Sequence, residues 1–182
     1  MTFPIGPYDL ILADPPWRFR TWTETNQKKS AKNHYPLLRT SDLQHIPVGA
    51  SVSKDAVLVL WATQAQLPDA IGLLSHWGFA YKTAGAWAKR STTGRKWAFG
   101  TGYIFRCAAE FFIVGTRGSP KTAAKNVRNL IVAPNREHSR KPDEMYENLE
   151  QLWPNARKLE LFARSRRPGW DAWGNEIEKF ST

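Results

Sequence analysis

The 182-residue sequence contains one cysteine, Cys107, which excludes an internal disulfide and is typical of a reducing compartment. The four histidines are scattered and, with a single cysteine, show no zinc-ligand spacing, so we expect no metal site. No apolar run reaches the roughly 18 residues of a membrane-spanning helix, so we expect no contact with a membrane. Residues 1–10 lack the basic stretch and apolar core of a secretory signal. These absences favour a cytoplasmic protein.

Acidic residues are scarce in the middle of the chain. Residues 89–141 contain 12 basic side chains but only Glu110 and Glu137 as acids, which gives this segment a charge of +10. Residues 1–88 carry +2 and residues 142–182 carry −2, so the middle segment accounts for the whole net charge of +10. This asymmetry indicates a surface that faces a polyanion such as nucleic acid; a merely solvated basic face is the alternative.

Internal repeats and low-complexity linkers are also absent, and length and composition predict one globular domain over residues 1–182. Strands are predicted at five apolar runs, residues 8–13, 56–62, 79–88, 110–116 and 158–163. Several runs are apolar on both faces, which is typical of a mostly parallel sheet covered by helices on both sides.

Helical periodicity appears twice between these strands. The first apolar stripe consists of Leu67, Ile71, Leu74 and Trp77. The second consists of Met145, Leu149 and Leu152. Gly78 suits the end of the first helix, while Pro142 suits the first turn of the second and Pro154 its end. Alternating strands and helices predict a doubly wound α/β fold, and the aperiodic segments 18–55 and 89–109 predict functional loops.

The stretch LADPPW (residues 12–17) directly follows the first predicted strand, and ligands of open α/β sheets bind beyond the carboxyl ends of strands. Pro15 and Pro16 stiffen the backbone and remove two N–H donors, and Pro15 favours an extended Asp14. The stretch then offers a carboxylate, free carbonyl acceptors and the indole of Trp17, which suit a flat ligand with an amino group. A plain turn with Trp17 folded into the core is the alternative. A stacking indole should be half exposed in the protein alone.

Further motifs follow in order along the chain: HYP (34–36), LWAT (60–63), WGF (77–79), REHSRKPDE (136–144) and LELFARSRRPGWDAWGNE (159–176). Together with ADPPW (13–17), they resemble a family of adenine N(6)-methyltransferases. That family includes the catalytic subunit of the messenger-RNA adenosine methyltransferase and the DNA adenine methyltransferases of bacteria and phages. The resemblance implies a Rossmann-like, S-adenosylmethionine-dependent methyltransferase fold with a circularly permuted motif order, catalytic loop first and cofactor strand last.

The resemblance implies that residues 14–17 hold the target adenine. Asp14 and the Pro15 carbonyl would accept the two hydrogens of the 6-amino group, and Trp17 would stack on the base, with Pro16 completing the catalytic loop. Two aligned acceptors turn the nitrogen lone pair toward the methyl group, which is catalysis by positioning and electrostatics. The proton of the methylated nitrogen would leave to Asp14 or to water.

The cofactor residues are likewise implied by the resemblance. Lys141 would pair with the methionine carboxylate of S-adenosylmethionine, and Asp14 would meet its amino group. The ribose and adenine would contact residues at the end of the last predicted strand and after it, namely Glu160, Phe162, Arg164, Asn175 and Glu176. The alternatives are an exposed Lys141 at a helix start and a buried Glu160 paired with an arginine.

Basic and aromatic side chains are interleaved in the two aperiodic segments, and such mixtures bind phosphates and splayed bases. The predicted nucleic-acid-binding residues are Arg18, Arg20, Tyr35, Lys89, Arg95, Lys96, Trp97 and Arg106. In the alternative interpretation the aromatic side chains belong to the core.

The sequence thus predicts methyl transfer from S-adenosylmethionine to the 6-amino group of adenine in a nucleic acid, in a prokaryotic or phage-infected cell. DNA is favoured because the chain is compact, like the prokaryotic and phage members. An RNA adenosine methyltransferase is one alternative, and a catalytically inactive nucleic-acid-binding subunit is another; the intact loop from Asp14 to Trp17 disfavours the latter. Methylation of a protein amide is disfavoured by the basic middle segment. A homodimer or a partner subunit would complete the sequence specificity.

Overall fold

The computed structural model describes residues 2–17, 38–102, 104–137 and 139–180. Its strands are β1 (Tyr8–Ala13), β2 (Val52–Ala62), β3 (Ala80–Arg90), β4 (Ala109–Arg117), β5 (Leu130–Pro134), β6 (Lys158–Leu161) and β7 (Trp170–Trp173). They form one seven-stranded sheet in the order β5-β3-β4-β2-β1-β6-β7. Strand β4 runs antiparallel to β2 and β3, whereas the other neighbouring pairs are parallel. The predicted mostly parallel sheet is confirmed.

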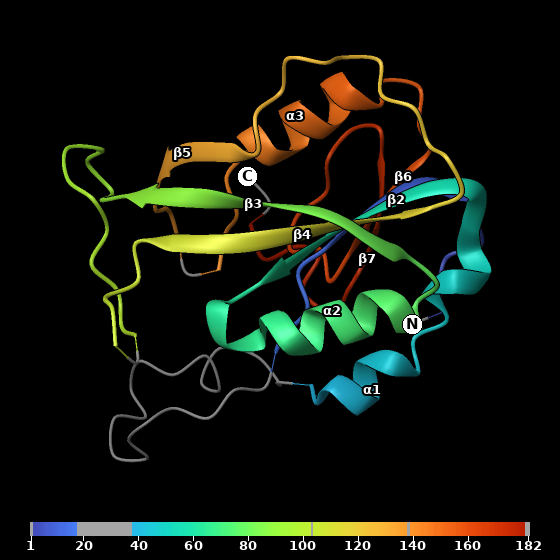
Figure 1. Ribbon diagram of the computed structural model, residues 1–182, viewed down its shortest axis with the longest axis horizontal. Helices are drawn as coiled ribbons and strands as arrows, with labels where there is room; N and C mark the ends of the chain where they lie inside the picture. Colours follow the sequence, from blue (N-terminus) through green and yellow to red (C-terminus); the bar gives the residue numbers. More distant parts are fainter. Residues whose placement is uncertain (1, 18–37, 103, 138, 181–182) are drawn as a thin grey trace.

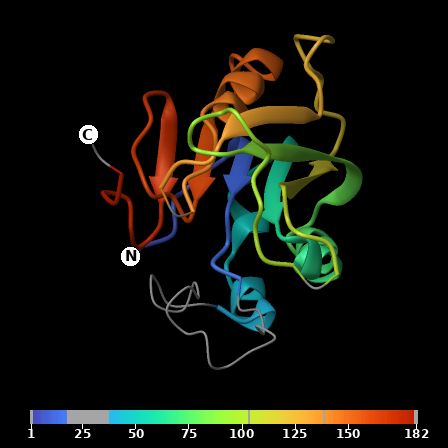
Figure 2. The ribbon, with the colours of Figure 1, turned by 90° about the vertical axis from the view of Figure 1, so that its left-hand side faces the viewer.

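Helices cover both faces of this sheet (Figure 1 and Figure 2). They are α1 (Thr40–Gln44), α2 (Leu67–His76) and α3 (Glu144–Leu152), with short 3-10 turns at Val48–Ser51 and Gln64–Gln66. On one face α2 packs into a core with Ile11, Leu58 and Ile113. On the other face α3 packs into a second core with Leu10 and Val59. This arrangement is the predicted doubly wound α/β fold.

Strand β1 lies in the middle of the sheet, between β2 and β6. Its residues alternate between the two cores: Ile11 and Ala13 face α2, while Leu10 and Leu12 face α3. All four are at most 2% exposed, which explains why this run is apolar without alternation. The buried strand fixes the position of Asp14, the residue that follows it.

The stripe predicted for α2 is partly wrong. Ile71 is 44% exposed, and the buried residues of the helix are Ala70, Leu73 and Leu74. Together with Trp77 these residues keep the helical spacing, but the stripe is rotated so that the small Ala70 faces the sheet. The predicted end is confirmed, since Gly78 has a φ of +88° and the Phe79 N–H closes the turn on the Leu74 carbonyl.

Other boundaries also differ from expectation. Helix α3 begins at Glu144 with Asp143 as its N-cap, so Pro142 precedes the helix instead of occupying its first turn. Periodicity did not predict α1, β5 or β7, which have only four or five residues each. The segment predicted as a loop over 89–109 begins inside β3 and ends inside β4. No helix in the described ranges is long and apolar enough to cross a membrane.

Tight packing between α2 and β4 can be tested at Gly115. A Cβ there would lie 2.7 Å from both terminal carbons of the fully buried Leu74. We expect Gly115→Ala to destabilise the fold by about 1–3 kcal/mol, because the core must move to admit the methyl group. The matched control is Gly72→Ala in α2, where nothing lies within 4 Å of the added carbon. It should stabilise the fold by about 0.5–1 kcal/mol. Urea unfolding measures both changes, and equal effects would contradict this packing.

Candidate functional site

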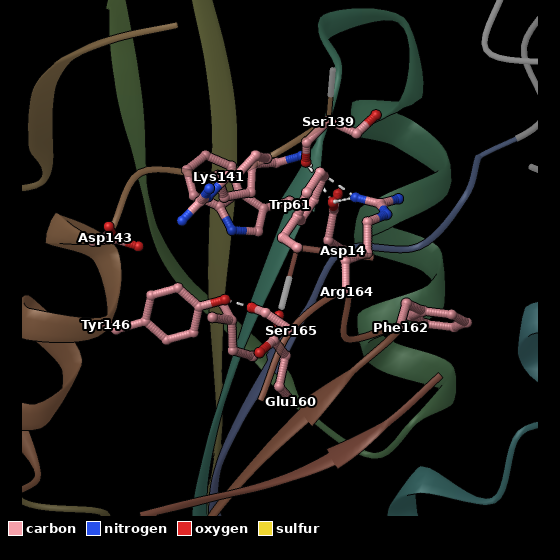
Figure 3. Close-up of a pocket in the computed structure, with 13 residues that line it drawn as sticks. Asp14, Trp61, Ser139, Lys141, Asp143, Tyr146, Glu160, Phe162, Arg164 and Ser165 are labelled. Carbon is pink, nitrogen blue, oxygen red and sulfur yellow. Dashed lines mark hydrogen bonds and ion pairs between the residues drawn. The ribbon is translucent and has the colours of Figure 1, made fainter. Parts of the chain in front are cut away.

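The site lies at the carboxyl ends of three neighbouring strands (Figure 3). Asp14 follows β1, Thr63 follows β2, and Arg164 comes shortly after β6. Two adjoining cavities open there, one of about 370 Å³ and one of about 50 Å³. Both are lined by Asp14, Trp61, Ser139, Arg140 and Lys141. The carboxyl-end position matches the ligand sites of other open α/β sheets.

Asp14 is held between two cations. Its Oδ2 lies 2.9 Å from Lys141 Nζ and 2.6 Å from an Arg164 guanidinium nitrogen. The three side chains are 15%, 11% and 9% exposed, so these charge-assisted hydrogen bonds are largely shielded from water. Arg164 also donates to the Ser139 carbonyl and pairs with Glu176 at 3.5 Å. The structure therefore brings together Asp14, Lys141, Arg164 and Glu176, as the resemblance implied.

Glu110 is a site residue that the sequence analysis did not select. It comes from β4, and its two oxygens lie 3.0 Å from Lys141 Nζ and 2.6 Å from Lys89 Nζ. Burial alone would raise the pKa of Glu110, but the two ammonium groups outweigh it and lower the pKa to about 2. Its signal in the sequence was its rarity, as one of two acids among the 12 basic residues of 89–141.

Lys141 is thus the central cation of the site, with a carboxylate on either side. Burial lowers its pKa, while Asp14 and Glu110 raise it by more, so the net shift of the pKa is upward. Its ammonium also lies 5.5 Å from the centre of the Trp61 ring. The interpretation of Lys141 as an exposed residue at a helix start is wrong. Its side chain is only 11% exposed, and the residue lies before the start of α3.

Glu160 of β6 and Tyr146 of α3 form a second buried pair on the wall of the smaller cavity. The Tyr146 hydroxyl donates to Glu160 Oε1 at 2.8 Å. Burial raises the pKa of Glu160; the Tyr146 hydrogen bond lowers it, nearby Asp14 raises it, and the result is about 7. The pKa of Tyr146 is also raised, mainly by burial. The hydrogen-bond partner of Glu160 is therefore a tyrosine, not the arginine considered from the sequence.

The expected half exposure of Trp17 is wrong. Its side chain is 6% exposed and packs in the core on the α2 face. The indole N–H donates to the Trp61 carbonyl at 3.0 Å, which anchors the ring between β1 and β2. Burying the large ring in the core, with its N–H hydrogen-bonded, is more favourable than exposing the ring to water. Trp17 still contributes to the wall of the larger cavity, but it does not stand out as an open stacking platform.

The expectation of free carbonyls in the loop is also wrong. The Pro15 carbonyl accepts the Trp17 N–H at 2.8 Å, and the Pro16 carbonyl accepts the Leu38 N–H at 2.9 Å. Two prolines remove two donors, but the chain turns back and satisfies the acceptors itself. A carbonyl oxygen has two lone pairs, so Pro15, which lines the larger cavity, retains the capacity to accept from a ligand.

Of the other predicted cofactor residues, Phe162 lines the smaller cavity and Asn175 does not. Phe162 has a φ of 62° and packs edge-on against Trp173 with ring centres 5.7 Å apart. A positive φ is strained for a bulky residue, and such strain gathers at functional sites. Asn175 is exposed and lies outside both cavity walls, while Glu176 reaches the site through Arg164.

The predicted nucleic-acid residues fall into three groups. Arg18, Arg20 and Tyr35 lie outside the described residues. Lys89 lines the larger cavity and pairs with Glu110. The remaining four, Arg95, Lys96, Trp97 and Arg106, are exposed on the loop between β3 and β4. Trp97 is 55% exposed, so the interpretation of this residue as part of the core is wrong.

The described side chains of the site do not form a group of metal ligands. Within the described residues, no three histidine, cysteine, aspartate or glutamate side chains are grouped so that they could hold an ion. The acids of the site, Asp14 and Glu110, instead have lysine and arginine as counter-ions.

The fold, with two cavities at the carboxyl ends of its strands, defines an α/β protein with a recessed and charged candidate binding site. A family model named MT-A70 matches residues 8–176. The chain therefore belongs to the MT-A70 family, which confirms the resemblance to adenine N(6)-methyltransferases seen in the sequence.

Individual relatives differ in how much of their length this chain spans. It is 33% identical to the type II methyltransferase M.MunI of Mycoplasma sp, with 96% of this chain and 79% of that protein covered. It is 32% identical to an N(6)-adenosine-methyltransferase MT-A70-like protein of Arabidopsis thaliana, covering 95% of this chain and 24% of the relative. It is 28% identical to the human catalytic subunit METTL3, covering 96% and 29%. The chain thus spans most of the first relative and about a quarter of the other two.

The charge of Glu110 should stabilise the fold in a pH-dependent way. Since its pKa is lowered from 4.5 to about 2, the contribution is present above about pH 4.5 and is lost as the pH falls toward 2. We expect Glu110→Gln to lower the free energy of unfolding at pH 7 by about 2–4 kcal/mol, because Lys141 and Lys89 lose a shared counter-ion. Urea unfolding at pH 7 to 3 should show this difference shrinking below pH 4.5.

The matched control is Glu137→Gln, the other acid of the middle segment, whose side chain is 57% exposed. Its effect should stay within about 0.5 kcal/mol. A Glu110→Gln variant as stable as the wild type would contradict the buried ion-pair arrangement.

Proposed function

We propose that this protein transfers a methyl group from S-adenosylmethionine to the 6-amino group of adenine in DNA. The observation that carries the proposal is the recessed Asp14 carboxylate, which the DPPW loop places on the common wall of the two cavities. The two cavities adjoin at this carboxylate, so a base and a cofactor bound along the common wall would meet at the same residue.

The side chains around the smaller cavity fit the chemistry of S-adenosylmethionine. The amino acid end of that molecule carries one positive and one negative charge, and Asp14 and Lys141 offer the complementary pair 2.9 Å apart. Glu160, with Tyr146 hydrogen-bonded to it, is the carboxyl group available to the ribose hydroxyls. The indole N–H of Trp61 is buried without a hydrogen-bond partner among the described residues, and it lies on the same wall. Bound S-adenosylmethionine would supply an electrophilic methyl group.

Asp14 and Pro15 then have definite roles in the reaction. Among the described residues both ion pairs of Asp14 use Oδ2, so Oδ1 is placed to accept a hydrogen of the adenine amino group. The second lone pair of the Pro15 carbonyl accepts the other hydrogen. These two acceptors orient the amino nitrogen without ionising it, which is positioning in a low-dielectric site. After transfer, the proton of the methylated nitrogen passes to Asp14 or to water.

DNA is proposed as the polymer because of one of the relatives. The relative that this chain matches over most of both chains is a type II methyltransferase, a name used for enzymes that modify DNA.

We expect the protein to produce N(6)-methyladenine in DNA when it is incubated with isotope-labelled S-adenosylmethionine. Duplex DNA, single-stranded DNA and RNA of mixed sequence are compared, and the methylated nucleosides are identified by mass spectrometry. The Asp14→Asn variant should lose about 100-fold or more in rate, because the carboxylate acceptor is removed. The matched control Asp69→Asn, at an exposed position in the first turn of α2, should match the wild type.

The outcomes separate the parts of the proposal. Label in RNA alone would make the choice of DNA wrong. A normal rate for a folded Asp14→Asn variant would remove Asp14 from its role. Label in no adenine of any polymer would contradict the enzymatic function and favour the inactive nucleic-acid-binding subunit.

Cofactor affinity should depend on the ionisation of Glu160. Its pKa of about 7 means that the carboxyl group is mostly protonated at pH 6 and mostly ionised at pH 8. Because the ribose hydroxyls donate, the ionised form is the better acceptor, and we expect the Kd for S-adenosylmethionine to fall about tenfold from pH 6 to pH 8. Calorimetric titration without nucleic acid measures the Kd directly.

The Glu160→Gln variant should bind more weakly at pH 8 and show a flat pH profile. The exposed Glu144→Gln control should retain the wild-type profile. A wild-type affinity that does not change with pH would contradict the ribose-binding role of Glu160.

A further inference from the structure

The loop between β3 and β4 stands at the mouth of the larger cavity. Its two stems contribute to the cavity wall, Trp87 and Lys89 from β3 and Glu110 from β4. The loop then extends beyond the ends of both strands, away from the sheet (Figure 1, green to yellow). Any large substrate that delivers a group to this cavity must pass close to the loop.

The described part of the loop has a defined conformation. The Ala98 N–H bonds the Lys89 carbonyl at 2.8 Å, so β3 continues into a short hairpin that pairs Arg90 with Trp97. Farther along, the Gly100 N–H bonds the Cys107 carbonyl at 2.8 Å. At Gly102 a Cβ would overlap the Phe105 carbonyl oxygen, so this turn requires glycine. The described backbone of the loop is therefore held by hydrogen bonds on both sides of its tip.

Apolar side chains are concentrated and exposed on this loop. Trp97 is 55% exposed, Phe99 80%, Ile104 89% and Phe105 86%. These are four of the nine large hydrophobic side chains that are exposed in the described part of the chain. Single exposed hydrophobics are ordinary, but a cluster on one loop beside a cavity marks an interaction surface.

The charges around these tips identify the kind of partner. The Arg90 guanidinium lies 3.7 Å from the centre of the Trp97 ring, and that of Arg106 lies 5.4 Å from the centre of the Phe99 ring. No acidic residue occurs between Lys89 and Ala109, whereas five basic residues do, both ends included. Apolar tips with cations beside them match a base stack bordered by phosphates.

We propose that Ile104 and Phe105 enter the base stack of duplex DNA and occupy the space left when the target adenine leaves it. This inference rests on the proposed function and deepens it, because it assigns a duplex substrate. Asp14 is only 15% exposed and recessed in the cavity wall, so an adenine within an intact duplex cannot reach it. Extruding the base loses its stacking and pairing, and an apolar side chain in the gap offsets part of that loss.

The test compares a paired with an unpaired target adenine. The methylated context is first located by sequencing the products of a mixed-sequence duplex. Oligonucleotides of that context are then prepared with the target adenine opposite thymine, opposite an abasic site, or in a single strand. The variant is Ile104→Ser/Phe105→Ser, which should fold normally because both side chains are exposed. The control is Ile5→Ser, 84% exposed and preceding the amino end of β1, whereas Asp14 and the cavities lie beyond its carboxyl end.

We expect the double variant to lose at least tenfold in kcat/KM on the paired target and less opposite an abasic site, where the pairing is already absent but the stacking remains. On the single strand, which has no duplex stack to leave, the loss should be less than threefold. Wild-type enzyme with 2-aminopurine at the target should show a fluorescence increase on binding duplex, and the variant should show little. Equal losses on all three substrates, or methylation of single strands alone, would overturn the inference but leave the methyltransferase function standing. A change of sedimentation coefficient in the variant would overturn it in favour of a protein interface. Label in no adenine would instead contradict the proposed function itself.

Discussion

The site depends on the Asp14 carboxylate, which forms ion pairs with Lys141 and Arg164 at the same time. Isolated buried charges are unfavourable, so each of these groups requires the others, and each comes from a different part of the chain. Asp14 follows β1, Lys141 precedes α3, and Arg164 follows β6. The ion pairs therefore join the central strand to elements on both sides of it. The same contacts that hold these segments together leave a carboxylate, an ammonium and a guanidinium on the wall of a cavity.

Much of the fold could be predicted from the sequence because the sheet is buried on both faces. Long apolar runs such as those of β1 and β2 have no other stable environment, and their strand assignments hold. The short strands β5 and β7 could not be found this way, since β5 exposes Leu130 and Val132 and β7 has four residues. The periodicity of large apolar residues also predicted the wrong buried face for α2. The small Ala70, which is buried, contributes little to such a pattern.

The strand end pointed to Asp14 and the family resemblance to Lys141 and Arg164, whereas contacts that depend on packing could not be predicted. Asp14, Lys141 and Arg164 come together as the motifs implied. The sequence could not reveal that Trp17 gives its N–H to the Trp61 carbonyl, since that contact joins residues 44 positions apart. Nor could it reveal that Glu110 completes the environment of Lys141, because the pairing of β2 with β4 brings that acid to the cavity.

The basic middle segment therefore serves two physical purposes that its composition alone cannot distinguish. Lys89 and Lys141 face inward, where both pair with Glu110 and Lys141 also pairs with Asp14. Arg95, Lys96 and Arg106 face outward on the loop between β3 and β4, where solvent screens them and a polyanion can approach. Under the proposed function, the outward group faces the phosphates, while the inward group shapes the electrostatic potential in the cavity. For these five residues of the segment, the position relative to the strand end decides whether the charge is paired in the cavity wall or exposed on the loop.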